Sequence, residues 1–304
     1  SADLLVVNAA RVSLSKRHSS LSRTDPNLIR FLYHNNHWTP FGHPQLAMRF
    51  ELHPKRLLWL LSATTVGSER LTEQGITVER GSLWYWLKNK HLYGSLEPTI
   101  ERAITEAAPV AAEVAGVRPG PFLGPSVAFP ITDAWIAEHP RERLKLGWMT
   151  VLVEAPVPVR TQLFKTKVSM VENEVSRRYH SAPPSYFWPE KWRAKAPNVK
   201  QGSLKTGVKH PHVADFVAKS VYKLSDWGYR ALLKLDVCPE QARFLLPQGM
   251  MTQWYWTGSL EAFVRAINLR TEAHAQEETW KIMQNIKQLM REQWPLTSRM
   301  TFGP

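Results

Sequence analysis

The chain has 304 residues, of which 43% are hydrophobic and 21% are charged, so it can bury a core and is neither disordered nor fibrous. No apolar run reaches the ~18 residues that a membrane-spanning helix needs, and the first residues lack the pattern of a secretory signal. The single cysteine, Cys238, excludes a disulfide framework and a cysteine-rich metal site. These features predict a soluble protein of a reducing compartment, with the cytoplasm as its expected location.

Positive charge is distributed unevenly along the chain. Lysine and arginine number 39 against 26 acidic residues, a net charge of +13. The segment Glu51–Lys145 has 11 basic and 11 acidic residues, whereas Arg160–Lys205 has ten basic and three acidic residues. An excess this local predicts an anionic partner, either nucleic acid or nucleotides and similar small anions.

The first half of the chain has patterns of both strands and helices. Asp25 and Pro26 are a suitable cap and first turn for a helix, and Arg118–Pro130 is rich in proline and glycine, as in a loop. In chain order we expect a strand at Asp3–Val7, a helical start at Ala9–Ser13, a helix from Asp25 through Tyr33, an ordered turn at His37–His43, a strand at Gln45–Leu52, and helices at Arg80–Leu92 and Glu97–Ala115.

The second half of the chain is predicted to be mostly helical. We expect a strand at Met149–Val153, a helix containing Gln162, an irregular ordered loop at Ala182–Asn198, and helices at Val213–Leu235, Pro239–Leu246 and Leu260–Gln293. The last helix would have about nine turns if unbroken. Helices dominate and the strands are far apart in the sequence, so the expected fold class is α+β.

One short segment concentrates chemically useful side chains. Asn173–Tyr179 contains an amide, a carboxylate, a hydroxyl and two guanidinium groups within seven residues. A carboxylate with an amide can hydrogen-bond the edge of a base, and Arg178 can hold a phosphate through two parallel hydrogen bonds. The residues alone also allow a polar helix start with a solvated basic pair.

Asn173–Tyr179 resembles the core signature of the flavin-dependent thymidylate synthases, which make thymidylate without a catalytic cysteine. Five further segments resemble this family in the same order: Ala9–Ser13, His37–His43, Glu154–Gln162, Ala242–Pro247, and Asn268–Arg270 with His274–Gln276. The resemblance covers roughly residues 2–50 and 148–290. It implies one domain over residues 1–304 with a mixed or antiparallel sheet and helices, and an inserted, mainly helical subdomain at 51–145.

The resemblance also implies which residues hold the pyrimidine nucleotide. These residues are Gln162, Glu174, Ser176, Arg177, Arg178, Arg243 and Arg270. Arg178 and its neighbours would bind the phosphate, while Arg270 would lie against the uracil and favour its ionised, electron-rich form. Arg270 also continues the apolar helical face of Leu260 and Phe263, so it should be paired or point into a site. Arg270, Glu174 and Ser176 are the expected catalytic residues.

The resemblance also implies which residues would hold a flavin: Ser13, Thr39, Lys165, Thr166, Lys167, Asn173, Glu174, Ser259, Glu261 and His274. Two short segments among these positions depart from the family pattern. Lys165–Lys167 stands where the family has Arg-His-Arg, and lysine loses the planar, bidentate fork of arginine. Ser259 and Glu261 stand where the family has Asn-x-Arg, and Glu261 reverses a charge. His274 is more simply a structural histidine.

The resemblance implies one-carbon transfer from methylenetetrahydrofolate to C5 of a pyrimidine nucleoside monophosphate, with dUMP converted to dTMP. FAD would supply the hydride and NADPH would reduce the flavin, in a homotetramer whose sites are shared between subunits. The altered flavin positions leave an alternative open: a dUMP or dCMP hydroxymethylase with altered or absent flavin use, because a hydroxymethyl product needs water instead of a hydride.

Two other interpretations remain from the residues alone. The basic block contains Tyr186, Trp188 and Trp192, and cations beside aromatic rings can hold single-stranded nucleic acid. The pair His210 and His212 has a spacing that could chelate a metal, but it is more simply a polar start to the next helix, so no metal is assigned. Cys238 has no neighbouring base, which favours a bland thiol.

Overall fold

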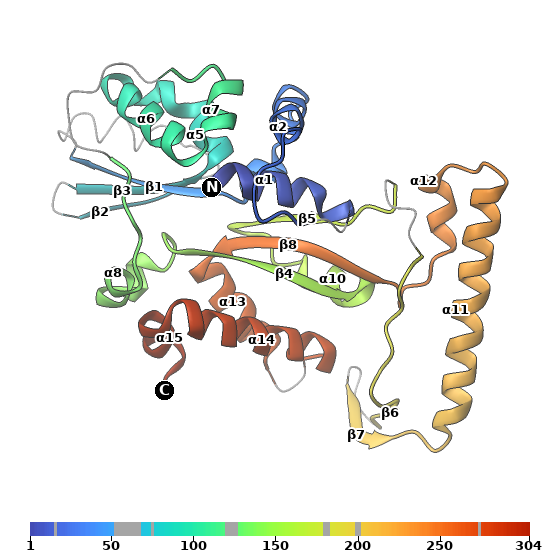
Figure 1. Ribbon diagram of the computed structural model, residues 1–304. Coiled ribbons are helices and arrows are strands. Elements are labelled where there is room, and N and C mark those ends of the chain that lie inside the picture. Colours follow the sequence, from blue (N-terminus) through green and yellow to red (C-terminus); the bar gives the residue numbers. More distant parts are fainter. Residues whose placement is uncertain are drawn as a thin grey trace.

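The computed structural model describes residues 1–14, 17–51, 68–73, 76–118, 127–178, 183–197, 202–272 and 275–304, with backbone alone at residues 13 and 14. Its named strands form two three-stranded sheets and one two-stranded sheet, all with antiparallel pairing. Helices cover both three-stranded sheets (Figure 1). The predicted α+β class is therefore confirmed. None of the described helices combines the length and the apolar character that crossing a membrane requires.

The central sheet has the strand order β4 (Trp148–Pro156), β8 (Met251–Ser259) and β5 (Met170–Glu174). Successive side chains of a strand point to opposite faces, and the aromatic run of β8 follows this rule. Trp254 and Trp256 are fully buried in one apolar cluster, whereas Tyr255 packs in a different cluster. The helices α13 (Leu260–Arg270) and α14 (Glu277–Gln293) pack on the first face, and the N-terminal segment lies on the second (Figure 1).

The second sheet has the order β1 (Gln45–Glu51), β3 (Ile76–Ser82) and β2 (Ser68–Glu73). The expected insertion supplies β2 and β3, which extend a sheet begun by β1. A shared apolar cluster joins Val6 of the N-terminal helix, Ile29, Trp86 and Ile104. Tyr85, Trp86 and Leu87 are buried in this cluster, as their apolar character requires. The described part of the insertion is mainly helical, as expected. Its status as a subdomain of a single domain stays a prediction.

The remaining elements lie around the two sheets or, like the long helix α11 (Pro211–Lys234), to one side of them (Figure 1). In the N-terminal half they are α1 (Ala2–Ala10), α2 (Asp25–His34), α3 (Thr39–Gly42), α5 (Leu83–Asn89), α6 (Glu97–Ala107), α7 (Pro109–Val114), α8 (Asp133–Glu138) and α9 (Pro140–Arg143). In the C-terminal half they are α10 (Val157–Leu163), β6 (Arg193–Lys195), β7 (Ser203–Gly207), α11 (Pro211–Lys234), α12 (Pro239–Ala242) and α15 (Pro295–Phe302). Short 3-10 turns lie at Arg11–Leu14, Lys90–Leu96 and Arg243–Leu245.

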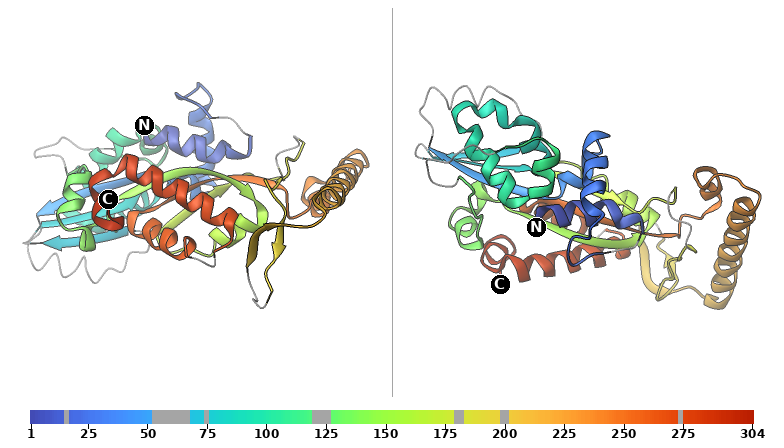
Figure 2. Two further views of the ribbon diagram at one scale, coloured as in Figure 1. Left: turned by 90° about the horizontal axis from the view of Figure 1, so that it is seen from below. Right: turned by 45° about the horizontal axis from the view of Figure 1, so that its top comes forward.

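The long helix α11 stands apart from the rest of the chain in every view (Figures 1 and 2). One of its 24 residues, Tyr229, is buried. Several large apolar side chains along it are exposed, with Phe216 at 70% and Trp227 at 68% of their maximal area. A row of exposed apolar side chains on one helix is typical of an interaction surface.

The expected strand at Asp3–Val7 is wrong, because these residues lie inside α1. The Ser1 side chain accepts a hydrogen bond from the Leu4 N–H and caps this helix. The buried carboxylate of Asp3 accepts hydrogen bonds from the N–H groups of Val110 and Ala111, at 2.9 and 3.0 Å, and ties α1 to the start of α7. A contact across more than a hundred residues therefore stabilises a helix that local propensity disfavours.

Three predicted helices have different boundaries in the structure. Arg80 and Gly81 belong to β3, so the helix expected from Arg80 begins at Leu83, where Ser82 caps it. The helix expected over Glu97–Ala115 is divided before Pro109. The long helix expected over Leu260–Gln293 is two helices, since α13 ends at Arg270 and α14 begins at Glu277. Two acidic residues in the first turn of α14 favour a new helix start there.

Candidate functional site

Four of the residues expected to bind nucleotide line one cavity of about 410 Å³. Glu174 ends β5, Ser176 and Arg177 follow it, and Arg243 begins the 3-10 turn after α12. Arg160 of α10 lines the same cavity. With Thr252 of β8, the site brings one carboxylate, two hydroxyls and three guanidinium groups together from four separate parts of the chain. A cavity of this size and composition suits a small phosphorylated molecule.

Pairing with β8 fixes the position of Glu174. Glu174 pairs with Trp254 of β8. The next residue, Val175, continues this pairing, because its N–H donates a 2.8 Å hydrogen bond to the Gln253 carbonyl. The Glu174 carboxylate accepts a hydrogen bond from Thr252 Oγ1 at 2.7 Å and lies 3.0 Å from Arg160 Nε. These two neighbours hold the carboxylate at the cavity wall, where its remaining acceptor positions can bind a ligand hydroxyl or amide.

Arg177 is the most buried cation of this cavity, with 8% of its area exposed. Burial lowers the pKa of its guanidinium, and electrostatic interactions with Tyr229 and Tyr186 partly oppose this shift. An anion bound in the adjoining cavity would interact favourably with this buried cation.

Arg178 does not line the cavity and lies beside it with 45% of its side chain exposed. Its backbone N–H and its Nε both lie 3.4 Å from Ser176 Oγ, a cavity residue. Its Nη1 lies 3.5 Å from Glu240 at the start of α12. Arg178 therefore links the segment after β5 to the helix that leads to Arg243.

Gln162 and Arg270 lie elsewhere, among α10, α13 and α14. The side-chain oxygen of Gln162 accepts a hydrogen bond from Thr279 Oγ1 at 2.5 Å. The backbone carbonyl of Gln162 accepts one from Arg270 Nη2 at 3.1 Å. Neither residue lines the cavity of Arg177 and Arg243. Within the described residues, Arg270 Nε is buried and has no hydrogen-bond partner. The predicted nucleotide residues thus form two groups in one copy of the chain.

The residues expected to contact a flavin are also spread out. Lys165 and Lys167 are exposed on the turn after α10, and Lys167 pairs with Glu172. Thr39 begins α3, and Asn173 donates a 3.4 Å hydrogen bond to the Ala9 carbonyl. Thr166 is half-buried on the same turn as the two lysines. His274 lies outside the described residues.

Ser259 and Glu261 have local structural roles. Ser259 is fully buried, and its Oγ accepts a hydrogen bond from the Ala262 N–H at 3.1 Å, so it caps α13. Glu261 is exposed in the first turn of that helix, where the helix dipole favours a negative charge. These contacts explain both residue types without a flavin, and their role toward one stays a prediction.

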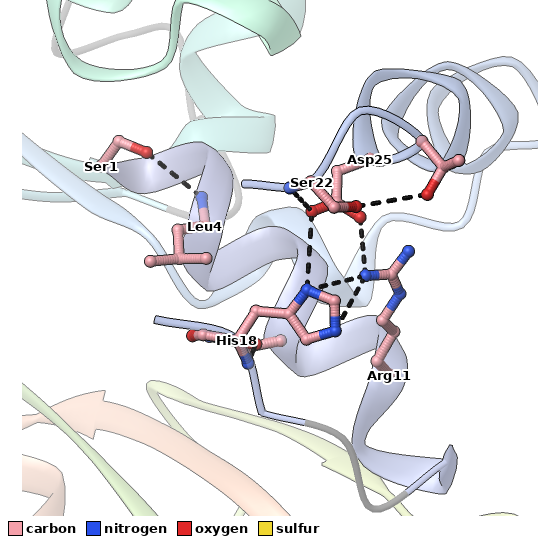
Figure 3. Close-up of polar contacts among 8 residues, drawn as sticks. Ser1, Leu4, Arg11, His18, Ser22 and Asp25 are labelled. Carbon is pink, nitrogen blue, oxygen red and sulfur yellow. Dashed lines mark hydrogen bonds and ion pairs between the residues drawn. The ribbon is translucent and has the colours of Figure 1, made fainter. Parts of the chain in front are cut away.

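An ion-pair network holds the turn that carries Ser13 (Figure 3). Arg11 Nη1 lies 2.6 Å from the buried Asp25 carboxylate, and His18 lies 3.8 Å from the same group. Burial alone would raise the pKa of Asp25, but hydrogen bonds from Ser22 and the charges of Arg11 and His18 outweigh it and lower the pKa. The network joins the segment after α1 to the start of α2. Ser13 lies in the 3-10 turn that begins at Arg11, and its role stays a prediction.

His43 links three elements near the central sheet, and the sequence analysis assigned it no role. It is fully buried, with Nδ1 at 2.8 Å from Thr257 Oγ1 of β8 and Nε2 at 3.4 Å from Asn173 Oδ1 of β5. Burial lowers the pKa of His43 to about 4, against an ordinary value of 6.5, although the contact with Asn173 opposes the shift. His43 is therefore neutral at pH 7 and positions the residue that precedes Glu174. The sequence feature that could have pointed to this role is the place of His43 at the end of the ordered turn His37–His43.

The pKa of His43 predicts that the protein loses stability in mild acid. Below pH 6.5 the unfolded chain binds a proton at this histidine, whereas the native chain does not until about pH 4. The free energy of unfolding should therefore fall by up to about 3 kcal/mol between these two pH values. Urea unfolding of wild type and His43→Gln at several pH values measures this, and His43→Gln should show a shallower fall. His91→Gln, which changes an exposed histidine, is the matched control. Equal pH dependence in all three would contradict the prediction.

The aromatic residues of the basic block pack against α11. Tyr186 stacks on Tyr222 with ring centres 4.5 Å apart, and the Trp192 indole N–H donates to Asp215 at 2.7 Å. Trp188 packs edge-on against Tyr222 and Trp192. Rings engaged in this way are not arranged as an open stacking platform, which weakens the nucleic-acid interpretation.

Cys238 is exposed at the start of α12, five residues before Arg243, where the cavity-lining turn begins. We expect Cys238→Ser to leave turnover nearly unchanged, because the residue does not line the cavity. A cysteine mechanism would instead require its thiolate to attack C6 of the base. Steady-state kinetics and a search for a covalent nucleotide adduct by mass spectrometry test this. Lost activity together with a lost adduct would contradict the expectation.

The fold is α+β, and one of its cavities is lined by three arginines. The family model described as thymidylate synthase complementing protein matches residues 131–296, more than half of the 304 residues. The chain belongs to the thymidylate synthase complementing protein family. Its curated relatives are named flavin-dependent thymidylate synthases, so the membership puts the chain in a family of enzymes.

Two relatives illustrate the extent of the similarity. The chain is 31% identical over 153 residues to the flavin-dependent thymidylate synthase of Thermosipho africanus (strain TCF52B), covering 49% of this chain and 65% of that protein. It is 27% identical over 305 residues to that of Aquifex aeolicus (strain VF5), covering 95% and 94%. The chain thus spans slightly less than two thirds of the first relative and nearly all of the second.

A solved structure shows a weaker similarity. The crystal structure of a UMP/dUMP methylase PolB from Streptomyces cacaoi bound with 5-Br dUMP aligns with a TM-score of 0.47 and 20% identity. The alignment covers 67% of this chain and 88% of that chain. This similarity is too low to support a conclusion about function.

Proposed function

We propose that this chain transfers one carbon from methylenetetrahydrofolate to C5 of a pyrimidine nucleoside monophosphate and converts dUMP to dTMP. The observation that carries the proposal is the cavity in which Glu174, Ser176, Arg177 and Arg243 meet. These residues lie on the positions that resemble the nucleotide-binding positions of the family, and family membership supports the same chemistry.

Each cavity residue has a defined task in this proposal. Arg177 and Arg243 bind the 5′-phosphate, with Arg178 reaching it from the rim, because guanidinium groups pair with phosphate oxygens through two parallel hydrogen bonds. Ser176 and Glu174 orient the sugar and the base. Glu174 keeps its position through Thr252 and Arg160 while the ligand binds.

Arg270 has the catalytic task in this proposal. Its guanidinium lies against the uracil and stabilises negative charge on the ring, which makes C5 electron-rich and able to attack the methylene carbon. Gln162 contacts the same ring. The C5 proton leaves once the new carbon–carbon bond has formed. Because Gln162 and Arg270 do not line the phosphate cavity of their own chain, a second copy of the chain supplies them.

The exposed surface of α11 supports an assembly of several copies, and we infer a homotetramer. The exposed apolar side chains recur at helical spacing: Val213, Phe216, Val217, Val221, Leu224 and Trp227. A second copy of the chain covers such a surface most simply. The same association would bring the two groups of nucleotide residues together.

A bound flavin would supply the hydride that turns the transferred carbon into a methyl group, with NADPH as its reductant. Thr39, Asn173, Lys165 and Lys167 are the residues at family-like positions that would hold it. The two lysines keep the positive charge that the flavin phosphates need, but they are exposed and Lys167 is paired with Glu172. Arg80, which lines a second cavity, is a more deeply buried cation than these two lysines.

The contacts of Ser259 and Glu261 favour a second candidate reaction. Both residues serve the start of α13, and neither supplies the positive charge that the family has there. If flavin binding is lost, water adds to the transferred carbon and a dUMP or dCMP hydroxymethylase results. The nucleotide cavity serves both reactions equally.

Release of the C5 hydrogen tests the proposed chemistry directly. The purified chain is incubated with dUMP labelled with tritium at C5, methylenetetrahydrofolate, FAD and NADPH. Tritium release into water that depends on the folate supports one-carbon transfer at C5, and its absence would overturn the proposal. A visible absorbance spectrum of the purified protein reports bound oxidised flavin, and tritium release from a colourless protein that needs no added FAD would favour the hydroxymethylase.

A further inference from the structure

A second cavity, of about 510 Å³, lies between the insertion and the central sheet. Arg80 of β3 and Trp84 and Lys88 of α5 line it from the insertion. Trp38 lines it from the segment before α3, and Ser169 lines it from the turn before β5. The cavity therefore exists because two strands of the insertion extend the sheet begun by β1. Its size is typical of sites for drug-sized ligands and cofactors.

Arg80 gives this cavity an enclosed positive charge. It is 6% exposed, and it donates hydrogen bonds from Nη1 to Gln45 Oε1 at 2.6 Å and from Nη2 to the Lys145 carbonyl at 3.0 Å. Among the described residues, its Nε has no hydrogen-bond partner. Burial lowers the pKa of Arg80 to about 10, although Glu69 opposes the shift, so the side chain is still charged at neutral pH.

The charges around Arg80 favour an anion. Lys88 is a second cation at this cavity. Among the described residues that line it, one residue, Glu69, is acidic. Glu69 is engaged, because it accepts a hydrogen bond from Ser169 Oγ at 2.9 Å. A buried donor without a partner and an excess of positive charge are both relieved when a ligand with a negative group binds.

Aromatic side chains make the cavity suitable for a flat ring. Trp38, Trp84 and Tyr85 all line it. Trp38 is 51% exposed, which leaves much of its indole available to a ligand. Lys88 Nζ lies 4.6 Å from the centre of the Trp84 ring and 4.3 Å from that of Tyr33, so aromatic contacts hold the lysine at the cavity. Aromatic walls beside cations are the arrangement that binds planar, charged heterocycles.

We propose that this cavity binds a planar heteroaromatic ligand that carries a negatively charged group, held by Arg80, Lys88 and the tryptophans. Flavin nucleotides, reduced folates and NADP share this chemistry. A flavin is the expected occupant, an assignment that rests on the proposed function, because the cavity adjoins α3 and the turn after Lys165–Lys167. The insertion then supplies cations that compensate for the altered flavin positions of the core.

Binding titrations on the full chain test this proposal without measuring turnover. FAD, FMN, NADP⁺ and 5-formyltetrahydrofolate are titrated separately by calorimetry and by quenching of tryptophan fluorescence. At least one should bind, with affinity reduced about tenfold or more in Arg80→Gln. Lys88→Gln and Trp38→Leu should each weaken binding of the same ligand about threefold or more. Lys287→Gln is the matched control, since Lys287 also lies over an aromatic ring, that of Phe302, at 4.6 Å, outside the cavity.

The outcomes separate this proposal from the proposed function. If none of the four ligands binds, or if one binds equally to wild type and all cavity variants, the proposal is wrong. Titration with dUMP in the same proteins should give unchanged affinity, because the nucleotide cavity has other residues. Failure of the unmodified chain to bind dUMP would count against the proposed function instead. If thermal melting shows that Arg80→Gln does not fold, the exposed Lys88 and Trp38 variants decide the question.

Discussion

Replacing Arg243 by alanine should weaken dUMP binding about 30-fold or more while the fold stays intact. Removing one partner of a desolvated ion pair typically costs ~2–5 kcal/mol, and the partly buried Arg243 lines the cavity together with Arg177. Arg178→Ala should also weaken binding, but by less, because nearly half of that side chain is exposed and water screens its charge. Titration calorimetry with dUMP measures both effects.

Arg299→Ala is a suitable control for these variants. Arg299 is an exposed arginine of α15, outside both cavities, so its removal changes the net charge equally without touching the site. Thermal melting of each variant shows whether the fold is kept. If Arg243→Ala and Arg178→Ala both bind dUMP as tightly as Arg299→Ala, the assignment of the nucleotide cavity is wrong.

Mixed assemblies of two inactive variants should regain activity. In the proposed site, Arg243→Ala damages the cavity that would bind the phosphate, and Arg270→Ala removes the group that would contact the uracil. Each should lose most of its turnover when alone. If each active site combines these groups from two copies, co-expressed chains assemble some sites that contain both arginines. Random pairing should then restore about a quarter of wild-type turnover.

A second mixture shows whether the recovery has this cause. Arg243→Ala combined with Ser176→Ala should not recover, because both residues line the cavity of the same chain. Each chain in this mixture carries one of the two changes, so every cavity lacks either the Arg243 guanidinium or the Ser176 hydroxyl. If the Arg243→Ala and Arg270→Ala mixture is no more active than the two variants separately, the sites are not shared in this way.

Elements with a strong local pattern could be predicted from the sequence. The helix expected at Val213–Leu235 is confirmed as α11, and the strand expected at Met149–Val153 is confirmed as the centre of β4. Both depend on periodicity and residue type over many positions. The choice of the nucleotide cavity residues depended on their resemblance to a family, and the structure brings four of them to one cavity.

Elements that depend on distant contacts could not be predicted. The aromatic strand β8 was missed, although it pairs with both β4 and β5 and forms the middle of the central sheet. The helical state of Asp3–Val7 depends on a cap and on hydrogen bonds from α7. Likewise, the cavity around Arg80 requires the sheet pairing of the insertion, which charge and composition do not reveal.

The separation of Arg270 from the phosphate cavity also could not be read from the sequence. Helical spacing placed Arg270 on the buried face of its helix, and the structure agrees that its Nε is buried. Spacing along a helix does not say which cavity a side chain serves. That information depends on how α13 packs on the sheet.

The mass of the nucleotide product tests the central claim most directly. The purified chain is incubated with dUMP, methylenetetrahydrofolate, FAD and NADPH, and the nucleotides are separated and analysed by mass spectrometry. One-carbon transfer followed by hydride addition predicts dTMP, in which a methyl group replaces the C5 hydrogen. Unchanged dUMP, or a hydroxymethyl group at C5, would contradict it.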